Sequence, residues 1–288
     1  MRLLLLGALV ASCAPAEDGC EPSGESRALH DDVREASGIA LSRRHRDVLW
    51  THNDSEGGAA VFAIDTEGNP LARVELSGAH NRDWEDMAVG PCPTGGPDGD
   101  CIFVADIGDN RATREGVGVW VASEPDPAST ETVDAAFIRL HYPDGARDAE
   151  AIAVLDDRSL VVVTKGREHR VSVYRSGPLD WPGADTAPVR LTRVQDLSAE
   201  AVDLPRQVTG ASNRGDLIAI RSYARLQFYR FSGDTLAAIL AEPIQLDSLA
   251  EPQGEGIALG DDGRAWLVSE AGPQAIAPRL TPLRCRLP

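Results

Sequence analysis

Short hydrophobic runs separated by Gly, Asp and Asn make up most of the chain after residue 34. The runs are rich in Val, Ile, Leu and aromatic residues, and apolar and polar positions often alternate within them. A period of two residues predicts β-strands, and there is little sign of the longer period of an amphipathic helix. We therefore expect an all-β fold.

An internal repeat organises these strands. Each unit opens with a run such as Glu-Gly-Ile-Ala-Leu and continues with a second apolar run. The opening runs are 37–41, 85–89, 150–154, 209–212 and 255–259, and the second runs are 48–54, 102–106, 160–165, 217–222 and 266–270. Third and fourth strand candidates follow most pairs, a repeat typical of a β-propeller.

Five four-stranded blades fit the repeat, forming a single propeller domain over residues 35–288. The last unit has only three good strands, so we expect residues 28–33 to supply its outer strand and close the ring with the C-terminal segment. A six-bladed ring is the alternative, because one more blade could lie within residues 177–206.

The N-terminus has the features of an export signal. A basic start is followed by the apolar residues 3–11, too short to span a membrane, and by small residues before Cys13. Residues 10–13 resemble the lipobox of bacterial lipoproteins. We expect residues 1–12 to be a signal peptide, Cys13 to be lipidated, and residues 13–34 to hold a tether in the cell envelope. An ordinary cleaved signal is the alternative.

Four cysteines remain after Cys13, an even number that suggests disulfides in an exported protein. They allow three pairings. We expect Cys92 to pair with Cys101, closing a loop rich in Gly and Pro, and Cys20 to pair with Cys285, joining the two chain ends.

The net charge of −17 argues against nucleic acid as a partner, because binding a polyanion begins with Lys and Arg. The sequence has no second apolar segment of spanning length, so we expect membrane contact only through the lipid anchor. It has a single lysine, Lys165. We expect a monomer.

Carboxylates recur at two places in the repeat, the start of the opening strand and the end of the second strand. Because these strands form an antiparallel hairpin, the two places lie at the same mouth of the central channel. The carboxylates are Glu85, Glu150, Glu255, Asp106 and Glu270. Oxygen ligands from separate strands suit calcium, whereas zinc would favour histidines. The alternative is that each Glu caps a blade by accepting backbone N–H bonds.

The fifth unit, with its Asp-Asp-Gly turn at 261–263, resembles the repeat of NHL and gluconolactonase-type propellers. Residues 37–40 and 83–88 are similar to the SdiA-regulated and phytase-like propellers of exported bacterial proteins. The lactonase resemblance implies calcium-assisted hydrolysis, with His52 as a base and Lys165 stabilising an oxyanion. Alternatively, His52 bonds Asp54 and Lys165 pairs with a channel glutamate.

Two functions follow from these observations. We favour an envelope-tethered module with a calcium site at the channel mouth, which binds a protein, a glycan or a small molecule there. The alternative is a calcium-dependent hydrolase, lactonase-like or phosphoesterase-like, at the same mouth. A phosphorylated substrate would need cations such as Arg111, Arg114, Arg167 and His169. Motifs of serine hydrolases, P-loop proteins and zinc proteases are absent from the sequence.

Overall fold

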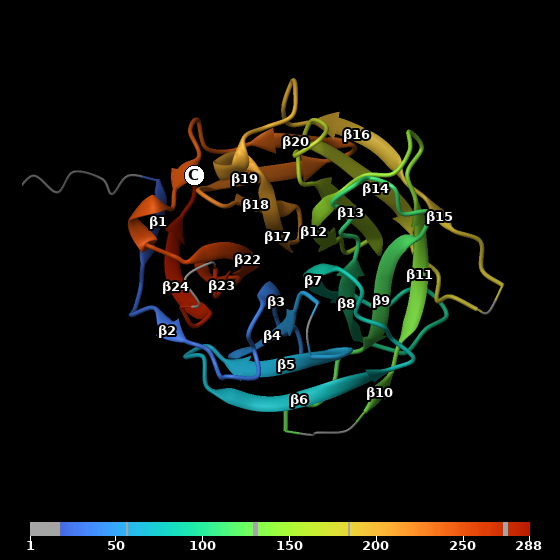
Figure 1. The fold of residues 1–288 in the computed structure, drawn as a ribbon, viewed down its shortest axis with the longest axis horizontal. Helices are drawn as coiled ribbons and strands as arrows, with labels where there is room; N and C mark the ends of the chain where they lie inside the picture. The colour runs from blue at the N-terminus through green and yellow to red at the C-terminus, as the bar shows by residue number, and fades with distance from the viewer. Residues whose placement is uncertain (1–17, 56, 129–131, 184, 273–275) are drawn as a thin grey trace, which may run out of the picture.

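The computed structural model describes residues 18–288 except 56, 129–131, 184 and 273–275. Five β-sheets stand around a central axis, each with its first strand innermost (Figure 1). The five-bladed propeller expected from the repeat is confirmed. The predicted signal peptide and Cys13 lie outside the described residues. Within the described residues, no helix is long and apolar enough to cross a membrane.

Blades 1 and 2 each gain a short parallel strand at the outer edge from the chain that follows them. Blade 1 comprises β3 (Ala36–Leu41), β4 (Val48–Asn53), β5 (Ala60–Asp65), β6 (Pro70–Ser77) and the added strand β10 (Val133–Asp134). Blade 2 comprises β7 (Trp84–Pro91), β8 (Asp100–Asp106), β9 (Val117–Ser123), β11 (Ala136–His141) and the added strand β15 (Val189–Arg190).

Blades 3 and 4 follow the same antiparallel order from the axis outward. Blade 3 comprises β12 (Ala149–Val154), β13 (Ser159–Thr164), β14 (Ser172–Pro178) and β16 (Thr192–Asp196). Blade 4 comprises β17 (Val208–Arg214), β18 (Leu217–Ser222), β19 (Arg225–Ser232), β20 (Thr235–Ala238) and β21 (Ile244–Gln245). Two 3-10 turns, η1 (Leu204–Arg206) and η2 (Asp247–Leu249), lie in the connections.

The fifth blade closes the ring with strands from both ends of the described chain. It comprises β22 (Gln253–Leu259), β23 (Arg264–Glu270), β24 (Arg279–Arg286), β1 (Gly19–Pro22) and β2 (Arg27–Ala28). Both N-terminal strands pair with β24. The prediction that residues 28–33 supply the outer strand is therefore wrong in its position. The closing strands β1 and β2 lie within residues 13–34, which were expected to form a tether.

Both predicted disulfides are confirmed. Cys20 and Cys285 occupy paired positions on β1 and β24, with their Cα atoms 4.0 Å apart. Cys92 and Cys101 close the turn between β7 and β8, with Cα atoms 4.9 Å apart. The first of these bonds fixes the seam where a propeller would open. Because disulfides persist in oxidising compartments, the pair indicates an exported protein.

The six-bladed alternative is wrong. The stretch 177–206 supplies β15 to blade 2 and β16 to blade 3 instead of forming a blade of its own. Blade 4 differs from the simple repeat, because two short strands pair with β19 on its outer side. The strand β20 pairs with residues 229–232 of β19, and β21 pairs with residues 225–226 of the same strand.

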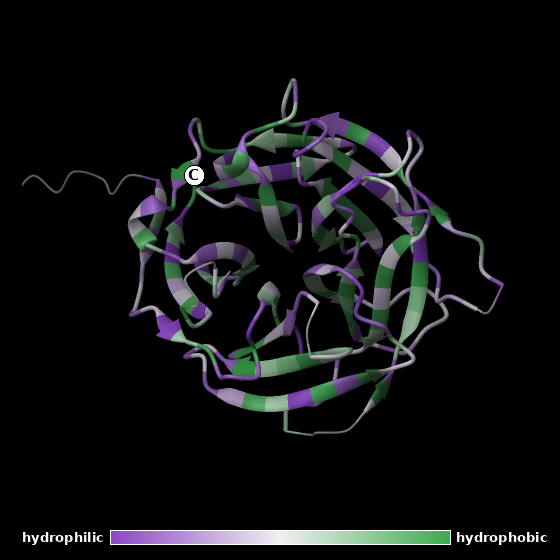
Figure 2. Cartoon of the chain, in the orientation of Figure 1, coloured by the Kyte–Doolittle hydropathy of each residue, from purple (hydrophilic) through white to green (hydrophobic). Residues whose placement is uncertain are grey.

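Apolar side chains fill the spaces between neighbouring blades. The strands β4, β12 and β13 are buried at every position, which explains their nearly continuous hydrophobic runs. The outer strand β6 instead alternates exposed and buried residues in its second half, and Figure 2 shows the matching alternation of hydrophilic and hydrophobic segments. The polar residues of the inner strands are therefore exceptions to an apolar core.

Candidate functional site at the acidic channel mouth

A β-bulge interrupts the first strand of every blade near its start. The register between first and second strands shifts at Ala36/Ile39, Trp84/Asp86, Ala149/Ala151, Val208/Gly210 and Gly254/Ile257. A bulge bends the strand and turns a side chain out of the ladder. The repeated polar residue occupies this bulge in each blade: Ser37, Glu85, Glu150, Thr209 and Glu255.

The two hydroxyl members of this set join neighbouring blades. Ser37 in blade 1 donates a hydrogen bond to the backbone oxygen of Glu85 in blade 2 at 2.6 Å. Thr209 in blade 4 donates to the backbone oxygen of Glu255 in blade 5 at 2.8 Å. Their role is to hold the glutamate-bearing bulges in place.

Asp86, the residue after Glu85, closes the channel below the mouth. It is fully buried. Its carboxylate accepts backbone N–H bonds from Met87 (2.8 Å), Ile152 (2.8 Å) and Ala211 (3.1 Å), which lie on three different blades. Burial raises the pKa of Asp86, and these N–H donors oppose the rise. The capping role proposed for the repeated Glu is thus performed by its neighbour Asp86.

Small residues occupy the position of Asp86 in the other four blades. A Cβ on Gly38 would lie 2.5 Å from the backbone nitrogen of Met87, and one on Gly256 would lie 2.7 Å from the backbone oxygen of Ser37. The axis has room for one larger side chain, which explains the Gly-Ile-Ala pattern of the repeat.

His52, predicted as a base, is fully buried below the mouth. Its Nδ1 lies 3.1 Å from the backbone oxygen of Asn53, and its ring packs edge-on against Trp84. Burial lowers the pKa of His52 to about 4, so the imidazole is neutral at pH 7. Its Nε2 has no hydrogen-bond partner among the described residues. These contacts are those of a packed core histidine.

Lys165 and Glu150 form a buried ion pair at the mouth, with 7% and 2% of their side chains exposed. Burial alone would lower the pKa of Lys165, but the carboxylates of Glu150 and Glu85 raise it above its usual value. Burial, and then Glu150, raise the pKa of Glu85 well above its usual range. Burial also raises the pKa of Glu150, but Lys165 opposes this rise, so the ammonium favours the charged form of Glu150.

Asp54, Asp83 and Glu85 form a compact group of acids beside this pair. One carboxylate oxygen of each lies within 4.8 Å of the others. Burial, then the charge of Asp83, raises the pKa of Asp54 to about 7. Asp54 Oδ1 is buried without a hydrogen-bond partner among the described residues. The group has the donor chemistry of a site for a hard cation.

Gly108 keeps the space between these carboxylates open. A Cβ at this position would lie 2.1 Å from Glu85 Oε1 and 2.6 Å from Asp83 Oδ2. The backbone also fixes the group, since Trp84 N–H donates to the Asp54 carbonyl at 3.2 Å and Gly108 N–H donates to the Asp83 carbonyl at 3.3 Å.

The other predicted ligands have partners within the protein. Asp106 accepts a hydrogen bond from Arg114 at 2.6 Å, in a pair that is almost completely buried. The amide of Gln253 bridges Glu255 (2.7 Å) and Glu270 (2.6 Å). Of the five carboxylates expected to bind calcium together, only Glu85 lies in the open acidic group. Asp83 was not among the residues expected from the sequence to bind calcium, although it lies only two positions before Glu85.

Besides Lys165, a second buried cation, Arg221, connects the fourth blade to the fifth by hydrogen bonds. It is fully buried and donates to the backbone oxygens of Gly256 (2.9 Å) and Val268 (3.1 Å) and to the carboxylate of Glu251. Arg167, considered for a phosphorylated substrate, donates to Asn110. These groups order the loops of the mouth.

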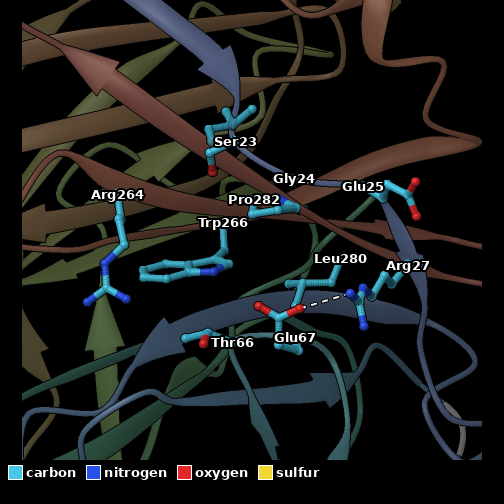
Figure 3. Close-up of a pocket in the computed structure, with 11 residues that line it drawn as sticks. Ser23, Gly24, Glu25, Arg27, Thr66, Glu67, Arg264, Trp266, Leu280 and Pro282 are labelled. Atoms are coloured by element: carbon cyan, nitrogen blue, oxygen red, sulfur yellow. Dashed lines mark ion pairs between the residues drawn. The ribbon is translucent and has the colours of Figure 1, made fainter.

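A separate hollow of about 170 Å³ lies at the seam between blade 5 and blade 1. Figure 3 shows Trp266 in its wall, Arg264 at one end and the Arg27–Glu67 ion pair at the other. This pair spans 3.0 Å, and both side chains are more than half exposed. Because it holds neither a group of carboxylates nor a buried unpaired charge, the hollow is a weaker candidate than the mouth.

No model of a known protein family and no curated protein matches the sequence. Solved structures do match the fold. The PQQ-bound aldose sugar dehydrogenase of Streptomyces coelicolor is 13% identical, with a TM-score of 0.55 over 94% of this chain and 99% of that one. A glucose dehydrogenase is 12% identical, with a TM-score of 0.50 over 91% and 99% of the two chains. A gluconolactonase from Xanthomonas campestris is also 12% identical, with a TM-score of 0.46 over 96% and 99%. At these identities the shared property is the β-propeller fold.

Proposed function

We propose that this protein is an envelope-anchored β-propeller lipoprotein that binds calcium at its acidic mouth and uses the ion to bind a ligand or partner. The observation that carries the proposal is the group of Asp54, Asp83 and Glu85, with the unpartnered oxygen of Asp54 among them. Cys13 would carry the lipid anchor.

The chemistry of the group favours calcium over zinc. Its donors are carboxylate oxygens, and it contains neither the histidines nor the cysteines typical of zinc sites. Calcium accepts six to eight oxygens in flexible geometry, so three acids leave positions for oxygens of a ligand. A glycan hydroxyl or a carboxylate of a partner protein would supply such oxygens. Because burial raises the pKa of Asp54 and of Glu85, protons compete with calcium for these carboxylates.

The second candidate is a calcium-dependent hydrolase of the lactonase or phosphoesterase type. The observation that favours it is the buried ammonium of Lys165 at the same mouth, which could stabilise a developing oxyanion. The ion would polarise the bond to be broken. We propose no proton transfer by His52, because its side chain is buried below the mouth.

Thermal unfolding tests the cation site directly. The protein is unfolded in EDTA and then with calcium, magnesium or zinc. Calcium at about a hundred times its dissociation constant adds about 2.7 kcal/mol, which raises the midpoint by about 5 to 10 °C for a domain of this size. We expect Asp54→Asn and Glu85→Gln to abolish this rise.

Matched controls are Asp134→Asn and Glu67→Gln, which remove exposed carboxylates far from the mouth. Both should keep the full calcium effect. An unchanged midpoint with every cation would show that the acids of the mouth serve the fold alone. If calcium binds, turnover of lactones and phosphoesters with and without Lys165→Met then separates the hydrolase from the binding module.

A further inference from the structure

The opposite mouth of the channel is a second cavity, and it is lined by arginines. The first strands of all blades run in the same direction, so the turns that follow them lie at the end of the ring away from Glu85. The turns of blades 1, 3, 4 and 5 border a cavity of about 440 Å³. Its cationic residues are Arg43, Arg46, Arg214 and Arg264.

Arg43 reaches across this opening. It projects from the first turn of blade 1 and donates to Asp156 of blade 3 at 3.1 Å, while its Nε lies 3.6 Å from Asp100 of blade 2. Blades 1 and 3 are not neighbours in the ring. The guanidinium therefore reaches from blade 1 past blade 2 to blade 3, pairs with carboxylates of both, and forms part of the cavity wall.

Arg214 presents a mostly buried guanidinium with unused donors to the cavity. Only 18% of its side chain is exposed, and its Nε donates to the backbone oxygen of Leu259 at 2.9 Å. Its two terminal nitrogens donate to no described residue, and the nearby carboxylate of Asp261 is itself 87% exposed to water. Burial lowers the pKa of Arg214, and the neighbouring charge of Arg43 adds to this effect. A guanidinium fork with free donors is the group that binds carboxylate or phosphate in a bidentate manner.

Hydroxyl groups would also find partners here. The carboxylates of Asp47, Asp156 and Asp261 and the side chain of Asn213 line the same cavity. Its volume lies in the range of small-molecule sites and exceeds the need of an inorganic anion. We propose that the arginine mouth binds an acidic monosaccharide, whose carboxylate or phosphate contacts Arg214 in place of Asp261 and whose hydroxyls contact Asp47 and Asp156.

This site is separate from the calcium group. The fully buried Asp86 fills the interior of the ring between the two mouths and accepts N–H bonds from the inner strands of three blades. Binding of the acidic sugar should therefore be the same in EDTA and in calcium. If the protein does not bind calcium, the acidic sugar should still bind. If the acidic sugar does not bind, calcium binding should be unchanged.

Calorimetric titration of the purified protein tests the proposal. The probes are glucuronate and glucose 1-phosphate, with glucose and inorganic phosphate for comparison. We expect one or both acidic sugars to bind, glucose not to bind, and inorganic phosphate to bind more weakly. Arg214→Gln should weaken binding at least about tenfold, because a hydrogen bond to a charged group is lost. Arg214→Lys should also weaken it, because the fork is lost although the charge remains.

Arg27→Gln is the matched control, since it removes an arginine from the seam hollow of Figure 3. It should leave binding unchanged. If Arg214→Gln does not fold, Arg46→Gln replaces it, because the Arg46 side chain is 92% exposed and contributes little to packing. We expect it to weaken binding a few-fold and to reduce the salt dependence. The proposal would be overturned if neither acidic sugar bound, or if glucose or inorganic phosphate bound as tightly as the acidic sugars. It would also be overturned if Arg27→Gln weakened binding as much as Arg214→Gln.

Discussion

The two mouths of the channel are built from opposite ends of the same inner strands, yet they carry opposite chemistry. At one end, bulges direct glutamates into a partly closed space, where burial raises the pKa of acids such as Glu85. At the other end, tight turns carry arginines that face aspartates across a wider opening. A chain with a net charge of −17 thus gathers four arginines around one cavity. Net charge describes the whole surface, whereas binding depends on the local field.

The ion pair of the acidic mouth gives the largest expected effect. Lys165→Met leaves Glu150 buried without its partner, so the free energy of unfolding should fall by about 3 to 5 kcal/mol. The double variant Lys165→Met with Glu150→Gln should recover most of this loss, because no unpaired charge remains. Urea unfolding measures both. If the double variant is no more stable than the single one, Lys165 acts through packing and not through its charge.

The separation of the mouths depends on Asp86. Asp86→Ala leaves three backbone N–H groups without their acceptor, including those of Ile152 and Ala211. We expect a loss of at least about 3 kcal/mol in the free energy of unfolding, measured in urea at pH 7. Asp86→Asn keeps one acceptor oxygen and should lose less. Equal stability of Asp86→Ala and the natural protein would contradict the view that this carboxylate holds the blades together.

The pH dependence of the acidic mouth follows from Asp54. Its pKa is about 7 in the folded state against 3.8 as the ordinary value, so the folded protein binds the extra proton between these pH values. In EDTA, the contribution of Asp54 to stability should therefore be present at low pH and be lost as pH rises through 7. Calcium competes with that proton, so the calcium-induced rise in midpoint should be larger at pH 8 than at pH 6.

Thermal unfolding at a series of pH values, with and without calcium, measures both trends. Asp54→Asn should flatten the EDTA profile near pH 7, whereas Asp134→Asn should leave it unchanged. A calcium effect that grows as pH falls would contradict the assignment of Asp54 as a ligand.

The smallest effect is expected at the arginine mouth. Asp261 lies 3.4 Å from Arg214 and competes with an anionic ligand for it, but its exposure weakens the attraction. Asp261→Asn should tighten binding of an acidic sugar a few-fold and leave the midpoint of unfolding nearly unchanged. Titration at low and high salt measures this gain, which should shrink as salt screens the pair. Weaker binding would show that Asp261 contacts the ligand.

Sequence patterns were sufficient for the fold and for part of the acidic mouth. The repeat placed Glu85, Glu150 and Glu255 at equivalent strand starts, and the structure places all three at bulges. The spacing of cysteines and the need to close a ring predicted both disulfides. The alternative role for Lys165, a pair with a channel glutamate, is the one that the structure contains.

Other features needed coordinates. The repeat grouped five carboxylates at two strand ends that meet at one mouth, but Arg114 and Gln253 bind three of them, and neither partner belongs to the repeated positions. Arg114 follows Asp106 in a loop whose path has no repeat signal. The arginine mouth was also missed, because its members lie in turns of different blades and come together only around the axis.

The sequence by itself determined the all-β propeller architecture and the residues repeated at each strand start, because these depend on local periodicity and on steric needs within one blade. The tertiary structure excluded a sixth blade, since residues 177–206 add strands to blades 2 and 3. The tertiary structure alone decided which carboxylates remain open, which are neutralised, and which arginines meet across the channel. The physical reason is that burial and charge pairing depend on distances between blades. Those distances are set when Cys20 and Cys285 come together and the ring closes.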